Sequence, residues 1–228
     1  GMIGMSFTNA RPSVAPTFSV QPVLGTNPIA FGAPTDEDFP FLYDAATSIT
    51  QRGKIEVLNR EEKPVKAGWV VNNEGSLIDD PGKVLSGLVS GEASLLPLGG
   101  LGEEYGGHKG YGLSAMVEIL SASLQSGAFL SALSGLDEQG NPTRFRVGHF
   151  FMAINIENFV DLPIFKKNIG DLLRELRASK KAPGQTRIYT AGEKEYYSTL
   201  DVRKKGVPIN ENLKKDLMHV QELLDLQE

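Results

Sequence analysis

The most constraining feature of this chain is a glycine-dense segment that leads directly into a long apolar one. Four of the seven residues from 106 to 112 are glycine. After them, apolar side chains recur at helical spacing, at Leu113, Met116, Val117, Leu120 and Leu124, while Ala115, Ile119 and Ala122 fill the other side. A helix that is apolar nearly all round is typical of a protein interior, so we expect this one to be buried. Glu118, the only acid from 111 to 130, would then need a polar partner.

Turn and capping signals divide the rest of the chain into short elements. Strands are predicted over residues 1–9, 29–33, 39–43, 149–156 and 187–189. Helices are predicted over residues 47–59 and 163–179. Another is predicted to begin at Lys83, with Asp80 as its N-cap, and a further one to begin within residues 192–195 and end at Gly206. Asn210 can cap a last helix, whose apolar stripe is formed by Leu213, Leu217, Val220 and Leu224. A polar loop is predicted over 136–145. This order predicts an α/β fold, α+β-like in combining helices with a mixed sheet.

Composition excludes several classes of function. The chain has 228 residues, 40% of them hydrophobic, which is enough for one large domain or two small ones. Its 23 basic and 28 acidic residues give a net charge of −5, so neither nucleic acid nor an anionic membrane is expected as a partner. The absence of cysteine removes disulfides, thiolate metal sites and cysteine nucleophiles, and it fits a cytoplasmic protein. No apolar run approaches the roughly 18 residues that a membrane-spanning helix requires.

The common catalytic and nucleotide-binding motifs are missing. No G-x-G-x-x-G follows a predicted strand, the spacing around Lys109 does not fit a Walker A loop, and neither H-E-x-x-H nor G-x-S-x-G occurs. The three histidines are scattered. We expect His149 to be a core or half-buried strand residue and His219 to lie on a solvated helix face. No metal site is predicted.

The start of the apolar helix is one candidate anion site. The glycines from 106 to 112 allow the backbone to approach a ligand closely, and free N–H groups at a helix start favour phosphate. Lys109 adds a full positive charge there, and His108 offers a ring edge or a proton. A flexible loop with a solvated lysine is the alternative interpretation.

Two further positions carry groups suited to a nucleotide. Gly192 precedes a predicted helix, where its amide could face an anion while Glu193 accepts hydrogen bonds from a ribose. Ordinary helix capping is the alternative. Asp44 lies at a strand end beside the small residues Ala45 and Ala46, and strand ends in α/β proteins are where ligands collect. An N-cap role for Asp44 is equally consistent with the sequence.

Several short motifs follow one another along the chain. They are Thr8-Asn9, Val14-Ala15-Pro16, Gly25-Thr26-Asn27-Pro28, Asp44-Ala45-Ala46-Thr47-Ser48, Leu96-Pro97-Leu98-Gly99-Gly100, His108-Lys109-Gly110-Tyr111-Gly112 and Gly192-Glu193. In this order they resemble the type-2 malate/L-lactate dehydrogenases over essentially the whole chain. The Gly-Thr-Asn-Pro and Lys-Gly-Tyr-Gly elements are the most specific of them.

The resemblance implies an NAD- or NADP-dependent oxidoreductase that transfers a hydride between nicotinamide and a small 2-hydroxy acid, with the matching 2-oxo acid as product. It implies a dinucleotide fold other than the Rossmann fold, and a homodimer. Carried over by position, the residues that contact the cofactor are Asp44, Ala45, Ala46, His108, Lys109, Gly192, Glu193 and Lys194, with Asn9 and Asn27 in matching motifs nearby. Where the family commonly has Pro-Gly-Glu, this chain has Ala191 in place of the proline.

One departure concerns catalysis. Family members carry a segment before the position matched by Gly1, and it supplies a catalytic histidine and the arginines that bind the substrate carboxylate. Neither is expected in this chain, whose first residues form a predicted strand without a polar lead-in. We therefore expect a cofactor-binding part of such an enzyme, with the missing segment either clipped off or supplied as a separate N-terminal chain.

We expect the chain to divide after residue 205. Residues 1–205 are expected to form the NAD(P)-binding domain, and residues 206–228 a C-terminal helix that packs on the missing part or on a partner. The alternatives are a non-catalytic dinucleotide-binding or assembly protein on a degenerate dehydrogenase scaffold, or a sugar-phosphate or nucleotide module that uses only the two glycine-marked helix starts.

Overall fold

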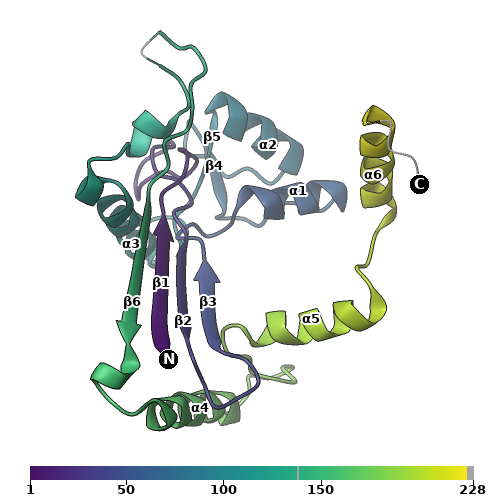
Figure 1. Ribbon diagram of the computed structural model, residues 1–228. Helices are drawn as coiled ribbons and strands as arrows, with labels where there is room; N and C mark the ends of the chain where they lie inside the picture. The colour runs from purple at the N-terminus through teal and green to yellow at the C-terminus, as the bar shows by residue number, and fades with distance from the viewer. Residues whose placement is uncertain (138, 225–228) are drawn as a thin grey trace.

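A four-stranded antiparallel sheet forms the centre of the molecule in a computed structural model that describes residues 1–137 and 139–224 (Figure 1). The strand order is β3-β2-β1-β6, with bounds Phe41–Ala45, Ile29–Ala33, Met2–Thr8 and His149–Asn155. The strands expected near the start of the chain and over 29–33 and 149–156 are confirmed. The strand expected over 39–43 begins and ends two residues later. The α/β class is confirmed as well, although every pairing within this sheet is antiparallel.

The two faces of the sheet differ in side-chain size. Gly4 and Ser6 pair with Gly32 and Ala30, so β1 and β2 present only small residues on one face, here called the small-residue face, although Phe151 of β6 and Leu42 of β3 also lie on it. The opposite face carries Phe7, which is 3% exposed and meets Phe150 edge to face at 5.7 Å between ring centroids. The long helix α3 (Gly107–Ser121) covers the larger-residue face beside β1 and β6. Asn9 lies two residues after Phe7 and therefore points to the same face, and its side chain bonds to Glu118 of this helix.

A second layer packs at the end of the sheet where β1 finishes. It consists of α1 (Arg52–Arg60), β4 (Val70–Asn72), α2 (Pro81–Ser90) and β5 (Ala93–Leu95). Its core contains Val14, Leu24, Ile55, Val65, Val70, Val84, Ala93 and Leu95. The predicted cap of α2 is confirmed, since the Asp80 carboxylate accepts a hydrogen bond from the Lys83 amide at 2.9 Å.

The first helix begins five residues later than its sequence predicts. Residues 47–49 pair with 96–98 instead, where the Leu98 amide donates to the Thr47 carbonyl at 2.8 Å and the Ile49 amide to Leu96 at 2.9 Å. These long-range backbone bonds hold the segment extended, so α1 starts only at Arg52. Asp44, eight residues upstream, is therefore not its N-cap.

The expectation that α3 is buried all round is wrong. Its buried face consists of small and polar residues, Gly107, Gly110, Ser114, Val117, Glu118 and Ser121. The apolar side is open, with Met116 39% and Ile119 58% exposed. Small residues face inward because the backbone of neighbouring segments comes very close: a Cβ on Gly110 would collide with the Leu98 carbonyl. The need of Glu118 for polar partners is confirmed.

The C-terminal third runs beneath and beside the sheet through α4 (Leu162–Ala178), α5 (Glu193–Lys205) and α6 (Glu211–Leu223) (Figure 1). The stop of α5 at Gly206 and the cap of α6 by Asn210, 2.8 Å from the Leu213 amide, are confirmed. The strand expected over 187–189 does not form, because Arg187 turns toward α5 and stacks on Tyr197, with 4.8 Å from guanidinium carbon to ring centroid.

Three single 3-10 turns complete the described secondary structure, at Ser123–Gln125, Leu130–Leu133 and Ile156–Asn158. The expected polar loop, apart from residue 138, which lies outside the described residues, is found between the second of these and β6. In Figure 1, α6 stands away from the sheet, and the Asn212 amide reaches back to the Arg60 carbonyl at 2.6 Å. Its apolar stripe is open, with Leu217 49% and Val220 47% exposed. Among the described residues, no helix combines the length and the apolar character needed to cross a membrane.

Candidate functional site

The outer edge of β3 connects the three segments that carry most of the predicted site residues. Because β3 is the last strand of the sheet, β2 satisfies one edge of its backbone only. At its beginning, the Leu42 amide donates to the Ala191 carbonyl at 3.2 Å, next to the start of α5. At its end, Ala45 leads to Thr47, which bonds to the segment before α3. The two glycine-marked helix starts therefore lie at opposite ends of one strand.

Asp44 lies near the end of β3 with an exposed carboxylate. In the described part of the chain, no donor forms a hydrogen bond or an ion pair with that carboxylate. Ala45 and Ala46 beside it are half-buried and add no bulk. This arrangement leaves an acceptor group open to a ligand at the strand end.

The first turn of α3 lacks both a capping side chain and an acid among the described residues. Gly106 adopts a left-handed conformation, with φ of 90°, and no side chain within residues 1–137 and 139–224 caps the helix. The turn holds no acid, and the side chains of His108 and Lys109 are both exposed. Unpaired N–H groups, the positive end of the helix dipole and an ammonium group thus face the same region.

The first turn of α5 is built in the opposite way. Gly192 is also left-handed, with φ of 88°, but Glu193 follows it and is completely buried. Its carboxylate accepts hydrogen bonds from the Thr190 amide at 3.0 Å and the Thr190 hydroxyl at 3.1 Å, and pairs with Arg187. Burial raises the pKa of Glu193, but the Thr190 hydrogen bonds and the Arg187 charge together hold that pKa below its ordinary value.

A charge network extends from Glu193 to the base of the sheet. Arg177 of α4 lies 3.5 Å from the Glu193 carboxylate and forms a two-pronged pair with Glu37, whose hydrogen bond raises the pKa of Arg177. Arg174 reaches Asp36 at 3.0 Å. These residues fix the loop before α5, yet no local pattern points to them, since Glu37 and Arg177 are 140 positions apart.

Asn9 and Asn27 lie in the interior. Both are 0% exposed and both donate to Glu118, each at 3.0 Å. The Asn27 side-chain amide also donates to the Ser114 hydroxyl at 3.0 Å, and its side-chain oxygen accepts a hydrogen bond from the Ala10 amide at 2.9 Å. The two asparagines thus join the end of β1 and the loop before β2 to the middle of α3.

The three histidines differ in setting. The expectation that His149 is a core or half-buried residue is wrong: its side chain is exposed on the small-residue face, where Nδ1 lies 2.9 Å from the Thr8 hydroxyl. The face of the sheet, rather than the apolar character of the strand, decides its burial. His219 is exposed on α6 as expected, and Lys194 lies on the outside of α5, with its ammonium 4.9 Å from the centre of the Tyr189 ring.

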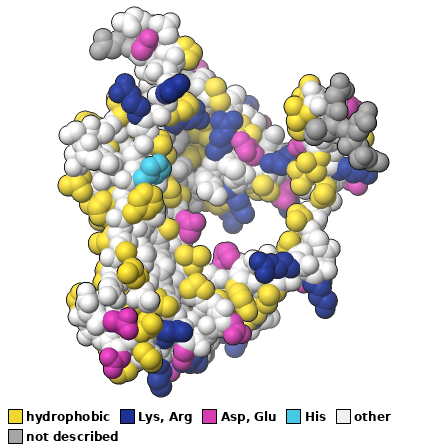
Figure 2. Space-filling view, in the orientation of Figure 1, with side chains coloured by type: hydrophobic (Ala, Val, Ile, Leu, Met, Phe, Trp, Pro, Cys, Tyr) yellow, Lys and Arg dark blue, Asp and Glu magenta, His cyan; other side chains and the backbone are white. Residues whose placement is uncertain are grey.

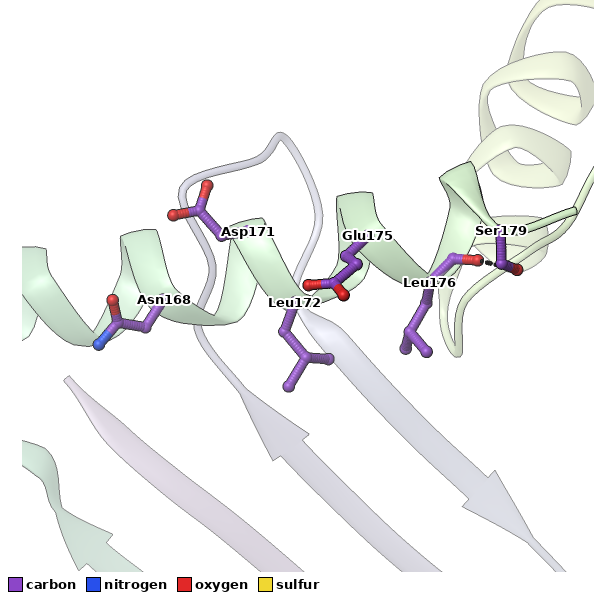
Figure 3. A pocket seen from close by; sticks show the side chains of 6 residues that line it. All are labelled: Asn168, Asp171, Leu172, Glu175, Leu176 and Ser179. Carbon is purple, nitrogen blue, oxygen red and sulfur yellow. Dashed lines mark hydrogen bonds between the residues drawn. The ribbon is translucent and has the colours of Figure 1, made fainter.

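An open hollow of about 610 Å³ lies along α4, apart from these residues. It is lined by Asn168, Asp171, Leu172, Glu175, Leu176 and Ser179. Figure 3 shows Leu172 and Leu176 pointing toward the side where the strands lie, and Asp171 pointing away from it. None of the predicted site residues lines this hollow.

Comparison with known proteins identifies close relatives. Residues 1–218 match the malate/L-lactate dehydrogenase family. The malate dehydrogenase of Pyrococcus horikoshii is 44% identical over 220 residues, which cover 96% of this chain and 58% of that protein. The malate/(S)-sulfolactate dehydrogenase of Methanothermus fervidus is 31% identical over 227 residues, 99% of this chain and 60% of that protein.

Solved structures of the same kinds of dehydrogenase also superimpose on this chain. The crystal structure of malate dehydrogenase from Entamoeba histolytica superimposes with a TM-score of 0.91 at 44% identity, and the match covers 100% of this chain and 63% of that one. The sulfolactate dehydrogenase of Methanocaldococcus jannaschii gives a TM-score of 0.75 at 33% identity. This chain therefore spans less than two thirds of the length of these relatives.

Proposed function

Because this chain belongs to the malate/L-lactate dehydrogenase family, we propose that it carries the cofactor-binding part of an oxidoreductase dependent on NAD or NADP. The enzyme would transfer a hydride between nicotinamide and a small 2-hydroxy acid such as malate or L-lactate, giving the 2-oxo acid. The observation that carries the proposal is that Asp44–Ala46, the start of α3 and the start of α5 all lie along the outer edge of one strand.

The groups along this edge fit an extended dinucleotide. From Leu42 to Ala46 the strand spans about 13 Å. At one end, Lys109 and the uncapped turn of α3 would bind the pyrophosphate, with His108 beside them. Asp44 would accept hydrogen bonds from a ribose, and Ala45 and Ala46 would leave room for it. When bound, the nicotinamide supplies the hydride acceptor or donor.

The start of α5 would bind the cofactor through its backbone and Lys194. Gly192 packs tightly on β3, since a Cβ there would lie 3.1 Å from that of Leu42. Glu193 acts as a positioning residue in this proposal, because protein donors already engage its carboxylate. Asn9 and Asn27 likewise act through Glu118, by fixing α3 against the sheet.

We assign no catalytic residue to these 228 residues. By family resemblance, the acid–base histidine and the substrate-binding arginines would come from another part of the complete enzyme or from a separate N-terminal chain. Residues 206–228 would pack on that part or on the second subunit of a homodimer, and the exposed stripe of α6 supports this role. The remaining residues, 1–205, would form the cofactor domain.

The test is a titration of NADH and NADPH against Lys109→Ala. Loss of a charge-assisted contact should weaken binding of the preferred cofactor by about 1.5–3 kcal/mol, roughly ten- to a hundredfold. Lys83→Ala is the matched control, because Lys83 is also an exposed lysine at the third position of its helix, α2. Unchanged affinity in Lys109→Ala would reject the assignment. If neither cofactor binds the parent protein, the degenerate-scaffold alternative is favoured.

A further inference from the structure

Two cationic side chains meet on one tyrosine beside the start of α5. The Arg187 guanidinium carbon lies 5.1 Å from the centre of the Tyr189 ring, and the Lys194 ammonium lies 4.9 Å from the same centre. Arg187 also lies 4.8 Å from the centre of the Tyr197 ring. Because positions 194 and 197 share one face of a helix, these four side chains gather on one side of α5.

The positive charge of this cluster is only partly neutralised. Lys194 is exposed and forms no ion pair with an acid in residues 1–137 and 139–224. Arg187 gives one terminal nitrogen to the buried Glu193 carboxylate, but its side chain is 45% exposed, so part of its guanidinium fork reaches solvent. Residues 179–194 hold four cationic side chains and one acid, and Figure 2 shows Lys and Arg side chains over α5 in a molecule whose net charge is −5. Excess positive charge in one place favours an anion.

The packing of α5 on β3 places these cations beside the ribose position of the proposed cofactor site. Leu42 and Asp44 are two residues apart on β3, so their side chains point to the same face, about 7 Å apart along the strand. A Cβ on Gly192 would lie 3.1 Å from the Leu42 Cβ, so α5 begins on that face as well. A ribose bound at Asp44 would therefore have the start of α5 as its neighbour.

NAD and NADP differ at the 2′ position of the adenosine ribose, which carries a hydroxyl in NAD and a phosphate in NADP, so cations there select NADP. We propose that Arg187 and Lys194 bind this 2′-phosphate and that the chain prefers NADP(H) to NAD(H). This preference rests on the proposed function, because it takes the ribose at Asp44 to be the adenosine ribose, held through its 3′ hydroxyl. The adenosine half of the cofactor then runs toward α5, and the nicotinamide half lies on the α3 side of Asp44.

The cluster is suited to a doubly charged phosphate. Tyr189 holds both cations in place before a ligand arrives, which lowers the entropy lost on binding. The planar fork of an arginine and the ammonium of a lysine are both common phosphate-binding groups. The two acids of the first turn offset this charge only in part. Glu193 is completely buried and also faces Arg177 at 3.5 Å, and Glu195 points about 100° away from Lys194 around the helix.

Separate fluorescence titrations of NADPH and NADH test this preference. The parent protein should bind NADPH at least about tenfold more tightly than NADH. Lys194→Gln should weaken NADPH binding at least about fivefold and NADH binding less than about threefold. Arg187→Lys keeps the charge that faces Glu193 and removes the planar fork, so it should also weaken NADPH more than NADH. Lys204→Gln, at an exposed lysine of the far end of α5, is the matched control and should change neither affinity more than about twofold.

The same comparison between 2′,5′-ADP and 5′-ADP, measured by calorimetry, removes the nicotinamide. The parent should prefer 2′,5′-ADP, and Lys194→Gln should reduce that preference. Equal affinity of the parent for NADPH and NADH would overturn the assignment of the 2′-phosphate and leave the proposed function standing. An unchanged ratio of the two affinities in both the Lys194 and the Arg187 variants would do the same. Failure of the parent to bind either cofactor would overturn the assignment and the proposed function together.

Discussion

The starts of α3 and α5 look alike in sequence and differ in structure. Each follows a glycine with positive φ, 90° at Gly106 and 88° at Gly192. The turn after Gly106 is free of acids and carries an exposed lysine, whereas the turn after Gly192 encloses the carboxylate of Glu193. A glycine before a helix makes close approach feasible, but the side chains of the first turn decide whether an external anion or an internal carboxylate uses the free amides.

The largest expected loss of stability follows a substitution at the start of α5, where the buried Glu193 carboxylate occupies the first turn. Glu193→Gln removes the charge that Arg187 and Arg177 face, and we expect the free energy of unfolding to fall by about 3 kcal/mol, at the low end for a broken buried pair. The low end applies because Arg187 is half-exposed and Arg177 keeps Glu37. Urea unfolding measures the loss. Glu195→Gln, exposed in the same turn, should cost less than about 0.5 kcal/mol, and equal losses in the two variants would contradict the role of Glu193 in holding the start of α5.

The two glycines themselves provide the next comparison. Alanine at either position adopts an unfavourable left-handed conformation at a cost of about 1 kcal/mol. At Gly106 the new Cβ would meet only the flexible Lys109 chain at 3.5 Å, but at Gly192 it would press on Leu42 at 3.1 Å. Gly192→Ala should therefore cost about 2 kcal/mol and Gly106→Ala about 1 kcal/mol in urea unfolding. The reverse order would show that the β3 contact yields easily.

Local signals predicted much of this fold but not the difference between the two starts. The residues next to them in sequence predict the limits of β2 and the capping roles of Asp80 and Asn210, and the structure confirms these predictions. The late start of α1 and the missing strand at 187–189 depend on partners far away in sequence. Glu193 illustrates the limit best: its sequence context suits a ribose acceptor, while its burial depends on a network that reaches α4.

Apolar periodicity has a similar limit. It correctly marked α3 and α6 as helices, but it indicates only which side of a helix is apolar, not what covers that side. In α3 the covered side consists of glycines, serines, one glutamate and a single apolar residue, Val117. The asparagines in the Thr8-Asn9 and Gly25-Thr26-Asn27-Pro28 motifs were placed near the site by resemblance. Their burial against Glu118 could not be deduced from spacing alone.

Acid should affect the two starts differently. The pKa of Glu193 is lowered in the folded protein, so its contribution to stability is present above the ordinary value of 4.5 and is lost as pH falls through the folded value. The unfolded chain then binds more protons than the folded one, and stability rises with pH in that window. Glu193→Gln should flatten this part of the profile in unfolding measured from pH 3 to 6, while Lys109→Ala should leave its slope unchanged. A parallel profile in Glu193→Gln and the parent would place the acid sensitivity elsewhere, for example at Asp36.

The smallest effect is expected at the one lysine that α5 could offer to the cofactor. Lys194 already contacts the Tyr189 ring, and Glu193 and Glu195 in the same turn oppose an anion. Lys194→Ala should therefore weaken NADH binding less than about threefold, against tenfold or more for Lys109→Ala. Fluorescence titration measures both, with Lys204→Ala at the far end of α5 as the control. If Lys194→Ala lost as much NADH affinity as Lys109→Ala, the pyrophosphate would be assigned to the start of α5. That result would also show that a helix start with a buried carboxylate in its first turn can still bind an external anion.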